Sequence, residues 1–269
     1  MRHTMTGAVT TSSKTPAMGG RFRYETDLVD ALAPVVAHSV FRRGDPDVVT
    51  FREVPAVRGV PDLVMIRFDP VVLAARAEHA VKPLSGDREV RIVQLLRRAG
   101  SLDRGGIARA TGLPLEYLRR SALPMLEQLG WLQMHAGDVM LRPGTAPVGR
   151  RVVTVEAKLR DWFRAFNQAR DQFHSADAAY IALDERAGGP LQDQVDAIAQ
   201  RGVGVILVNA DTNRHRVIAR PHRVLDRRMT SVGRELLSER SHALWSRGER
   251  SGQVSPVFGW YPPTSTHHN

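Results

Sequence analysis

The sequence predicts an α/β fold in which a mixed sheet, flanked by helices, is interrupted by a helical module. Three observations lead to this prediction. The chain has 269 residues, 42% of them hydrophobic, which is enough for one good core in one or two domains. After residue 151, apolar strand-like segments alternate with helical patterns, as in sheets that carry helices on their faces. Between about residues 71 and 150, the pattern changes to short helices followed by a hairpin.

The segment before residue 71 predicts one helix and two strands. Apolar residues at helical spacing predict a helix over 21–39, and β-branched residues predict a strand over 48–57. The sequence Gly59-Val60-Pro61 ends that strand, and a second strand, paired with the first, is expected over 63–68. Residues 1–20 are rich in Thr, Ser and Gly and lack the apolar centre of a signal peptide, so we expect a flexible N-terminus.

The C-terminal half continues the alternation of strands and helices. With the module removed, the expected order is helix, three strands, helix, strand, helix and strand, and the module sits in a loop where insertions are tolerated. The expected strands are 152–159, 178–183, 203–208 and an edge strand at 216–220, and the expected helices are 161–175, 189–200 and a final basic helix at 222–245. The domains assigned on this basis are 21–70 with 151–225 (a discontinuous α/β domain), 71–150 (the inserted module) and 226–269 (a C-terminal basic helix and tail).

The inserted module has the outline of a known DNA-binding unit. Helices are expected over 88–99, 104–111 and 114–129, with a bend at Pro124, and a hairpin over 131–142. The stretch from Ile107 to Pro114 and the helix after it resemble a winged helix-turn-helix. That resemblance implies DNA binding by Arg109, Arg119 and Arg120. The alternative is an ordinary three-helix bundle that contacts another protein.

Charge and composition narrow the partners. The net charge of +10 and the pI near 10.9 favour a polyanionic partner, and nucleic acid is preferred over acidic lipid. The chain has no cysteine, which excludes thiolate chemistry and fits a reducing cytoplasm, and it has no apolar run long enough to span a membrane. Of 38 basic residues only Lys14, Lys82 and Lys158 are lysines, so a lysine within a strand invites a chemical explanation.

Carboxylates and this lysine form the candidate reactive group. Glu156 and Lys158 are two residues apart in an expected strand and therefore share one face, whereas Val155 and Ala157 share the apolar face. Asp62 enters another strand directly after a turn. Two carboxylates that converge from neighbouring strands suit a hard cation such as Mg²⁺, and a nearby lysine can stabilise developing phosphoryl charge.

Pro61-Asp62 followed by Glu156-Ala157-Lys158 resembles the PD-(D/E)xK superfamily of restriction-endonuclease-like nucleases. The resemblance implies a nuclease that uses Mg²⁺ (or Mn²⁺) to cleave DNA, with Asp62 and Glu156 as metal ligands. It also implies a third ligand on the first helix, for which Glu25 is the best match and Asp27 a weaker one, and a catalytic Gln168 on the helix after the second strand. Arg160 is a candidate DNA contact beside the site, and the alternative for it is a solvated helix face. Asp62 and Glu156 are 94 positions apart (156 minus 62), a spacing that only an inserted domain makes compatible with the family.

Other interpretations of these residues stay open in the sequence. Glu156 and Lys158 could form a surface ion pair, Asp62 could cap its own turn, and Glu25 could be an exposed helix carboxylate. A DNA-binding regulator that has a nuclease-like fold without catalysis is the alternative function. The sequence does not choose between DNA and RNA or between exonuclease and endonuclease action, and it leaves homodimerisation open.

Overall fold

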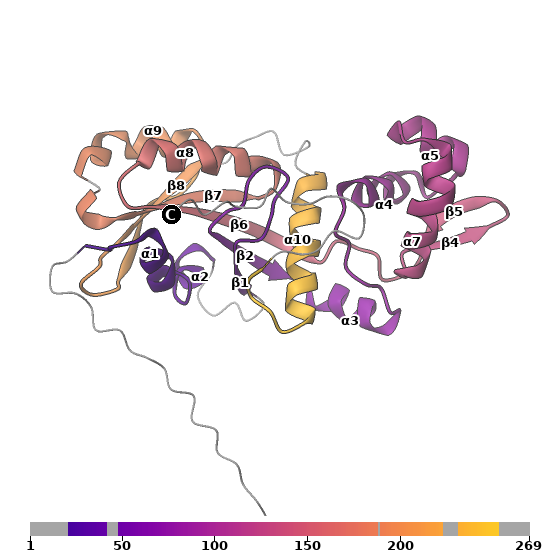
Figure 1. Ribbon diagram of the computed structural model, residues 1–269, viewed down its shortest axis with the longest axis horizontal. Helices are drawn as coiled ribbons and strands as arrows, with labels where there is room; N and C mark the ends of the chain where they lie inside the picture. The colour runs from indigo at the N-terminus through magenta and orange to yellow at the C-terminus, as the bar shows by residue number, and fades with distance from the viewer. Residues whose placement is uncertain (1–20, 42–47, 188, 223–230, 253–269) are drawn as a thin grey trace, which may run out of the picture.

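The computed structural model describes residues 21–41, 48–187, 189–222 and 231–252. It shows an α/β protein built on a six-stranded mixed sheet in the order β1-β2-β6-β7-β8-β9 (Figure 1). The predicted N-terminal segment 1–20 and the tail beyond residue 252 lie outside the described residues. The strands are β1 (Val48–Arg52), β2 (Leu63–Phe68), β6 (Gly149–Lys158), β7 (Ala178–Asp184), β8 (Val203–Val208) and β9 (His215–Ala219).

The pairing of β2 with β6 brings distant parts of the sequence together. Strands β1, β2 and β6 pair antiparallel in succession, whereas β6, β7 and β8 run parallel and β9 is antiparallel at the edge. Leu63 lies opposite Val155, and Phe68 lies opposite Gly149. The chain therefore leaves the sheet after β2 and re-enters it at the neighbouring position, which makes residues 69–148 an excursion between two adjacent strands.

Helices cover both faces of the sheet. On one face α1 (Glu25–Leu32) and α2 (Val36–Val40) pack their leucines and valines against Val153 and Val155 of β6. On the other face α8 (Trp162–Asp171) and α9 (Val195–Gln200) pack against alternate residues of β7 and β8. A short 3₁₀ turn, η2 (Gln172–His174), continues α8. This alternation follows from the side-chain period of two in a strand.

Residues 70–148 form a unit at one end of the molecule, on the right in Figure 1, and most of it surrounds an apolar core to which Leu236 of α10 also contributes. Ile107 and Trp131 are fully buried in this core. A small antiparallel sheet in the order β3-β5-β4 closes one side of it. The elements are α3 (Pro70–Glu78), α4 (Asp87–Ala99), β3 (Ser101–Asp103), α5 (Arg104–Thr111), α6 (Leu115–Tyr117), the π-turn η1 (Leu118–Ala122), α7 (Leu123–Gln128), β4 (Leu132–His135) and β5 (Asp138–Leu141).

Several boundaries differ from the sequence prediction for physical reasons. The single helix expected over 21–39 is two helices joined by a turn at 33–35. The strand expected over 48–57 ends at Arg52 because Glu53 has a φ of 52°, outside extended geometry. Pro124 has no N–H to donate, and the helix before it widens into the π-turn η1 where a bend was expected. The elements α3 and β3 were not predicted.

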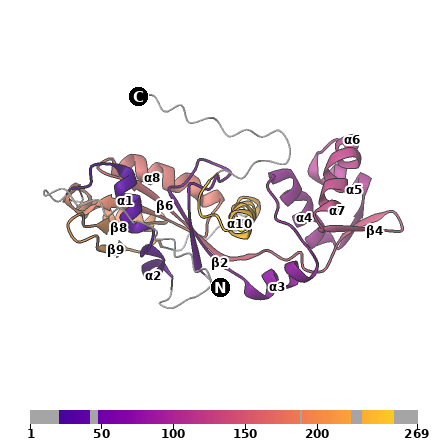
Figure 2. The ribbon, with the colours of Figure 1, turned by 60° about the horizontal axis from the view of Figure 1, so that its bottom comes forward.

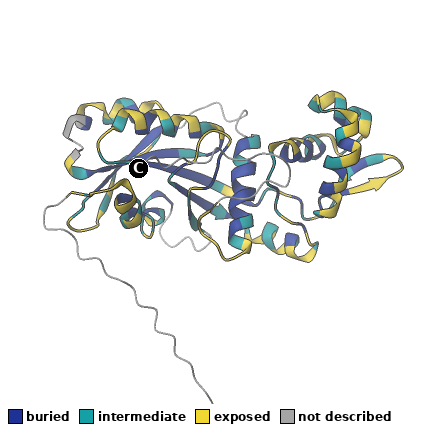
Figure 3. Cartoon of the chain, viewed as in Figure 1, coloured by how far each residue is buried: buried dark blue, intermediate teal, exposed yellow. Residues whose placement is uncertain are grey.

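The final helix, α10 (Ser231–Ser246), lies between the large sheet and the 70–148 unit (Figures 1 and 2). It is buried along most of its length (Figure 3). The sequence predicted a basic helix, but in α10 the charges of Arg234 and Arg240 are matched by those of Glu235 and Glu239. Residues 223–230, where this helix was expected to begin, lie outside the described residues. None of the helices in the described ranges is long and apolar enough to cross a membrane.

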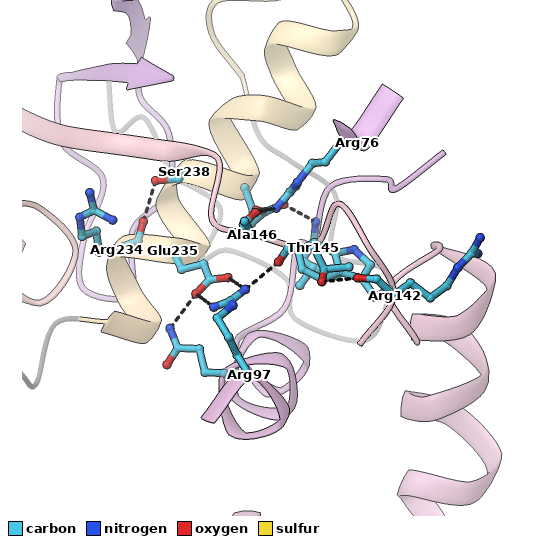
Figure 4. A network of polar contacts seen from close by, with 12 residues as sticks. Arg76, Arg97, Arg142, Thr145, Ala146, Arg234, Glu235 and Ser238 are labelled. Carbon is cyan, nitrogen blue, oxygen red and sulfur yellow. Dashed lines mark hydrogen bonds and ion pairs between the residues drawn. The ribbon is translucent and has the colours of Figure 1, made fainter. Parts of the chain in front are cut away.

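Arginine side chains attach α10 to the inserted unit. Arg97 of α4 donates to both carboxylate oxygens of Glu235 and to the carbonyl of Thr145 (Figure 4). Arg76 of α3 pairs with Glu239 at 2.6 Å, and both of these side chains are almost fully buried. A charge buried in this way is retained only when it is paired, so the unit has a preferred position against the helix.

Candidate active site

The site lies where the start of β2 meets the end of β6. Leu63, Val155 and Ala157 pack in the core beneath α1 and α2, so Asp62 and Glu156 are directed to the opposite face, which α8 covers. An Asp62 carboxylate oxygen accepts a hydrogen bond of 2.6 Å from the backbone N–H of Ala157. The structure therefore brings together two of the carboxylates that the sequence singled out, although they are 94 positions apart (156 minus 62).

Burial and mutual repulsion control the protonation of this pair. Glu156 is 3% exposed, and desolvation, followed by the charge of Asp62, raises the pKa of its carboxyl from 4.5 to about 8. Desolvation also raises the pKa of Asp62, against the lowering effects of the Ala157 N–H and of Lys158. At neutral pH the Glu156 carboxyl is therefore mostly protonated unless a cation offsets the repulsion.

Lys158 connects this pair to the first helix. Its ammonium donates to a carboxylate oxygen of Glu25 at 2.8 Å and to the carbonyl of Ala157 at 3.0 Å. The lysine side chain is 12% exposed and that of Glu25 is 47% exposed. Lys158 also lowers the pKa of both Asp62 and Glu156, so its charge acts on both carboxyls. Glu25 is thus near the site through its ion pair with the lysine.

The glutamine nearest the carboxylates is Gln172. Its side-chain amide donates to the carbonyl of Arg58 at 3.0 Å and to Glu156 at 3.5 Å. Gln168, the residue expected from the resemblance, lies four residues earlier, on the same side of the helical segment. The carboxamide oxygens of both glutamines are buried, and neither has a hydrogen-bond partner in the described structure. Gln172 was missed because the family pattern directs attention to one helical position; the repeat of Gln at a spacing of four was the available signal.

The donor atoms at this site fit a hard divalent cation. Within the described ranges, no group of three or more His, Cys, Asp or Glu side chains is arranged to hold a metal ion. Asp62 and Glu156 nevertheless offer two carboxylates, and Mg²⁺ is commonly held by one or two carboxylates while it keeps several waters. The carboxamide oxygen of Gln172, which is buried and has no donor in the described structure, is an acceptor suited to such a water. The donor set consists of oxygen alone, which suits Mg²⁺ or Mn²⁺.

The expected DNA-contacting arginines lie apart from this site. Arg119 and Arg120 are in η1, which leads into α7 at the far end of the inserted unit (Figure 1). Both form ion pairs with Glu116, although their side chains are 58% and 72% exposed. Arg109 is exposed on α5 of the same unit. Arg160 is exposed two residues beyond Lys158 and is the one member of this group that adjoins the carboxylates in sequence.

Comparison with known proteins assigns no family: no family model matches the chain, and neither a curated protein nor a solved structure matches it significantly.

Proposed function

We propose that this protein is a Mg²⁺-dependent nuclease that cleaves phosphodiester bonds in DNA. The observation that carries the proposal is the convergence of Asp62 and Glu156 from adjacent strands, both with raised pKa values, beside the ammonium of Lys158. Raised pKa values in a group with a specific charge partner are typical of functional sites. Oxygen-only donors and a net charge of +10 point toward phosphodiester chemistry on a polyanion.

The charge balance of the site supports a divalent cation. When ionised, Asp62, Glu156 and Glu25 carry three negative charges against the single positive charge of Lys158, which leaves an excess of two. Two of these carboxylates are largely desolvated, where repulsion costs most. A divalent cation held by Asp62 and Glu156 would neutralise the excess and allow both groups to ionise at neutral pH. This agreement of charge is the physical reason for proposing Mg²⁺.

Each residue of the chain has a role in the proposed reaction. Asp62 and Glu156 would hold the cation, which would supply Lewis acidity and a lowered pKa for water. The Ala157 N–H fixes Asp62, and Gln172 orients Glu156. Lys158 has its ammonium beside the carboxylates, where it stabilises negative charge that develops on the phosphoryl group. The Lys158–Glu25 ion pair holds that ammonium in place.

The proposal includes a restriction-endonuclease-like fold with an inserted winged helix. The order β1-β2-β6-α8-β7 supports the restriction-endonuclease-like fold, because three antiparallel strands are followed by a crossover helix and a parallel strand. The pairing of Phe68 with Gly149 supports the insertion, because it accounts for the long separation between Asp62 and Glu156. Three short helical segments followed by the β4–β5 hairpin support the winged helix, which would grip DNA through Arg109, Arg119 and Arg120.

Cleavage of supercoiled plasmid and of linear duplex tests the proposal. We expect nicking or cutting with Mg²⁺ or Mn²⁺, and loss of at least a hundredfold in rate for Glu156→Ala and Lys158→Ala. Arg201→Ala, an exposed change at the end of α9, serves as the matched control and should retain full activity. DNA binding should persist in every variant. Cleavage that survives both site substitutions would come from another source and would remove the proposal.

A DNA-binding regulator without catalysis is the second candidate. The observation that favours it is that Glu25 pairs with Lys158 and that, among the described residues, no third acidic side chain completes a metal-binding group with Asp62 and Glu156. The regulator requires DNA binding with no cleavage under any divalent cation. It also requires that Mg²⁺ leave the thermal stability of the native chain unchanged, because a protein that binds the ion in its folded state is stabilised by it.

A further inference from the structure

A tight turn next to Asp62 presents side chains that the proposed catalysis does not use. The N–H of Ala56 donates to the carbonyl of Gly59 at 3.0 Å, which closes the turn, and Gly59 has a φ of 70° that glycine adopts readily. The sequence Ala56-Val57-Arg58-Gly59-Val60, called the 56–60 turn below, directly precedes Pro61 and Asp62. Whatever contacts this turn is therefore close to the carboxylates.

The 56–60 turn is anchored from two other elements. The N–H of Val57 donates to the hydroxyl of Ser175 at 3.3 Å, and Gln172 donates to the carbonyl of Arg58 at 3.0 Å. Arg240 of α10 donates to the carbonyl of Pro55 at 2.8 Å. Backbone groups of Pro55, Val57 and Arg58 thus bond to the body of the protein, so the turn has a defined position.

Despite these anchors, the side chains of the turn face solvent. Val57 is 50% exposed and Val60 is 48% exposed, and Arg58 between them is exposed as well. An ordered turn that presents two valines and an arginine at the edge of a charged site has the composition of a contact surface. Apolar side chains pack against sugars or bases, while arginine binds phosphate.

Two further arginines lie in the segment that follows Lys158 in the chain. Arg160 follows Lys158 by two residues in the connection to α8. Arg164 lies in the first turns of α8, four and eight residues before Gln168 and Gln172, and therefore on the same side of the helix. Both are exposed. Among the residues that the structure describes, neither these two nor Arg58 has a carboxylate partner, in contrast to Arg119 and Arg120.

These arginines flank the carboxylates along the two strands that carry them. Arg58 lies four residues before Asp62, and Arg160 lies two residues after Lys158. A nucleic acid strand whose scissile phosphate lay at the carboxylates would have its adjoining phosphates near these segments.

We propose that the 56–60 turn together with Arg160 and Arg164 forms a strand-binding rim, which holds the phosphates on either side of the scissile bond in one nucleic acid strand. Arg58 binds on one side of the carboxylates, Arg160 and Arg164 bind on the other, and Val57 and Val60 pack against the sugars between phosphates. The inference rests on the proposed function, because only a nuclease has a scissile bond at this site. The binding of a nucleic acid strand by the rim does not itself require cleavage.

Binding of a fluorescent 20-mer duplex in EDTA, followed by anisotropy over a series of salt concentrations, tests the rim. Each phosphate contact contributes about 0.9 to the slope of log K against log salt. One contact therefore raises the affinity at 0.1 M salt about eightfold relative to its effect at about 1 M salt. We expect Arg58→Ala, Arg160→Ala and Arg164→Ala each to lower the slope by about 1 and the affinity by about that factor. Arg201→Ala changes an exposed arginine just before β8, at the end of the parallel strands opposite to Lys158, and as the control it should alter neither quantity.

Val60→Ser separates apolar contact from charge. It should weaken binding severalfold and leave the salt slope unchanged, because loss of an apolar contact releases no counterions. Arginine variants that bind like Arg201→Ala, or a native chain that binds no nucleic acid, would overturn the rim. Because EDTA prevents cleavage, the two proposals fail separately. Slope changes without cleavage under any metal would refute only the nuclease, and cleavage without slope changes would refute only the rim.

Discussion

Replacing Glu156 with Gln tests the electrostatics of the site through stability. The folded-state pKa of this carboxyl, about 8, is above its ordinary value of 4.5, so the folded state holds the proton more tightly than the unfolded state. Folding therefore loses stability as the pH rises from 4.5 to 8. At pH 7 the interval is 2.5 units (7 minus 4.5), which corresponds to about 3 kcal/mol. Glutamine is neutral and can still accept the hydrogen bond from Gln172.

We therefore expect Glu156→Gln to be more stable than the native chain at pH 7 by about 3 kcal/mol, and equally stable near pH 4.5. Urea denaturation in EDTA across this pH range measures the difference. Mg²⁺ should stabilise the native chain and leave the variant unchanged, because the variant lacks one of the two carboxylate ligands. A variant less stable than the native chain at pH 7 would refute the reasoning, since it would show that the ionised carboxylate is favourable in the fold.

Three further predictions follow from the same contacts. Below pH 8, Mg²⁺ must displace a proton from Glu156, so calorimetry should show an apparent affinity that falls by about tenfold per pH unit between pH 8 and pH 6. Replacing Gln172 with Leu removes a hydrogen bond that lowers the pKa of Glu156, so in a carboxyl-detected NMR titration Glu156 of this variant should titrate at a higher pH than in the native chain. Glu239→Ala should cost about 3–5 kcal/mol in urea denaturation because Arg76 remains buried without a counter-charge, while Arg76→Met combined with Glu239→Leu should recover most of that loss.

Alternation along β6 allowed the central part of the site to be predicted. The strand pattern placed Val155 and Ala157 in the core and Glu156 on the other face, and the structure shows this arrangement. Turn residues before Asp62 indicated a strand start, and β2 begins at Leu63. Local signals sufficed there because period and turn chemistry act over a few residues.

Contacts between residues distant in sequence could not be predicted in this way. Gln172 contacts Glu156 from the 3₁₀ turn after α8, so this contact depends on how that segment packs against the sheet and not on a local pattern. The burial of α10 depends on Arg76 and Arg97, which pair with glutamates 163 and 138 positions away. The arginines and glutamates of α10 could equally have faced solvent, so its sequence gave no indication that these charges are used for internal contacts.

The position of α10 explains how an excursion of eighty residues between β2 and β6 is compatible with an ordered site. Arg240 donates to the carbonyl of Ser85, just before α4 of the inserted unit, and to the carbonyl of Pro55, at the base of the 56–60 turn. One guanidinium thus connects the insertion to the backbone that leads into Asp62. Burial lowers the pKa of Arg240 to about 10, which leaves it charged at neutral pH. Because the arginine stays charged, the connection persists across the pH range in which Glu156 titrates, and the carboxyl can gain or lose its proton while the turn that leads to Asp62 keeps its attachment to α10.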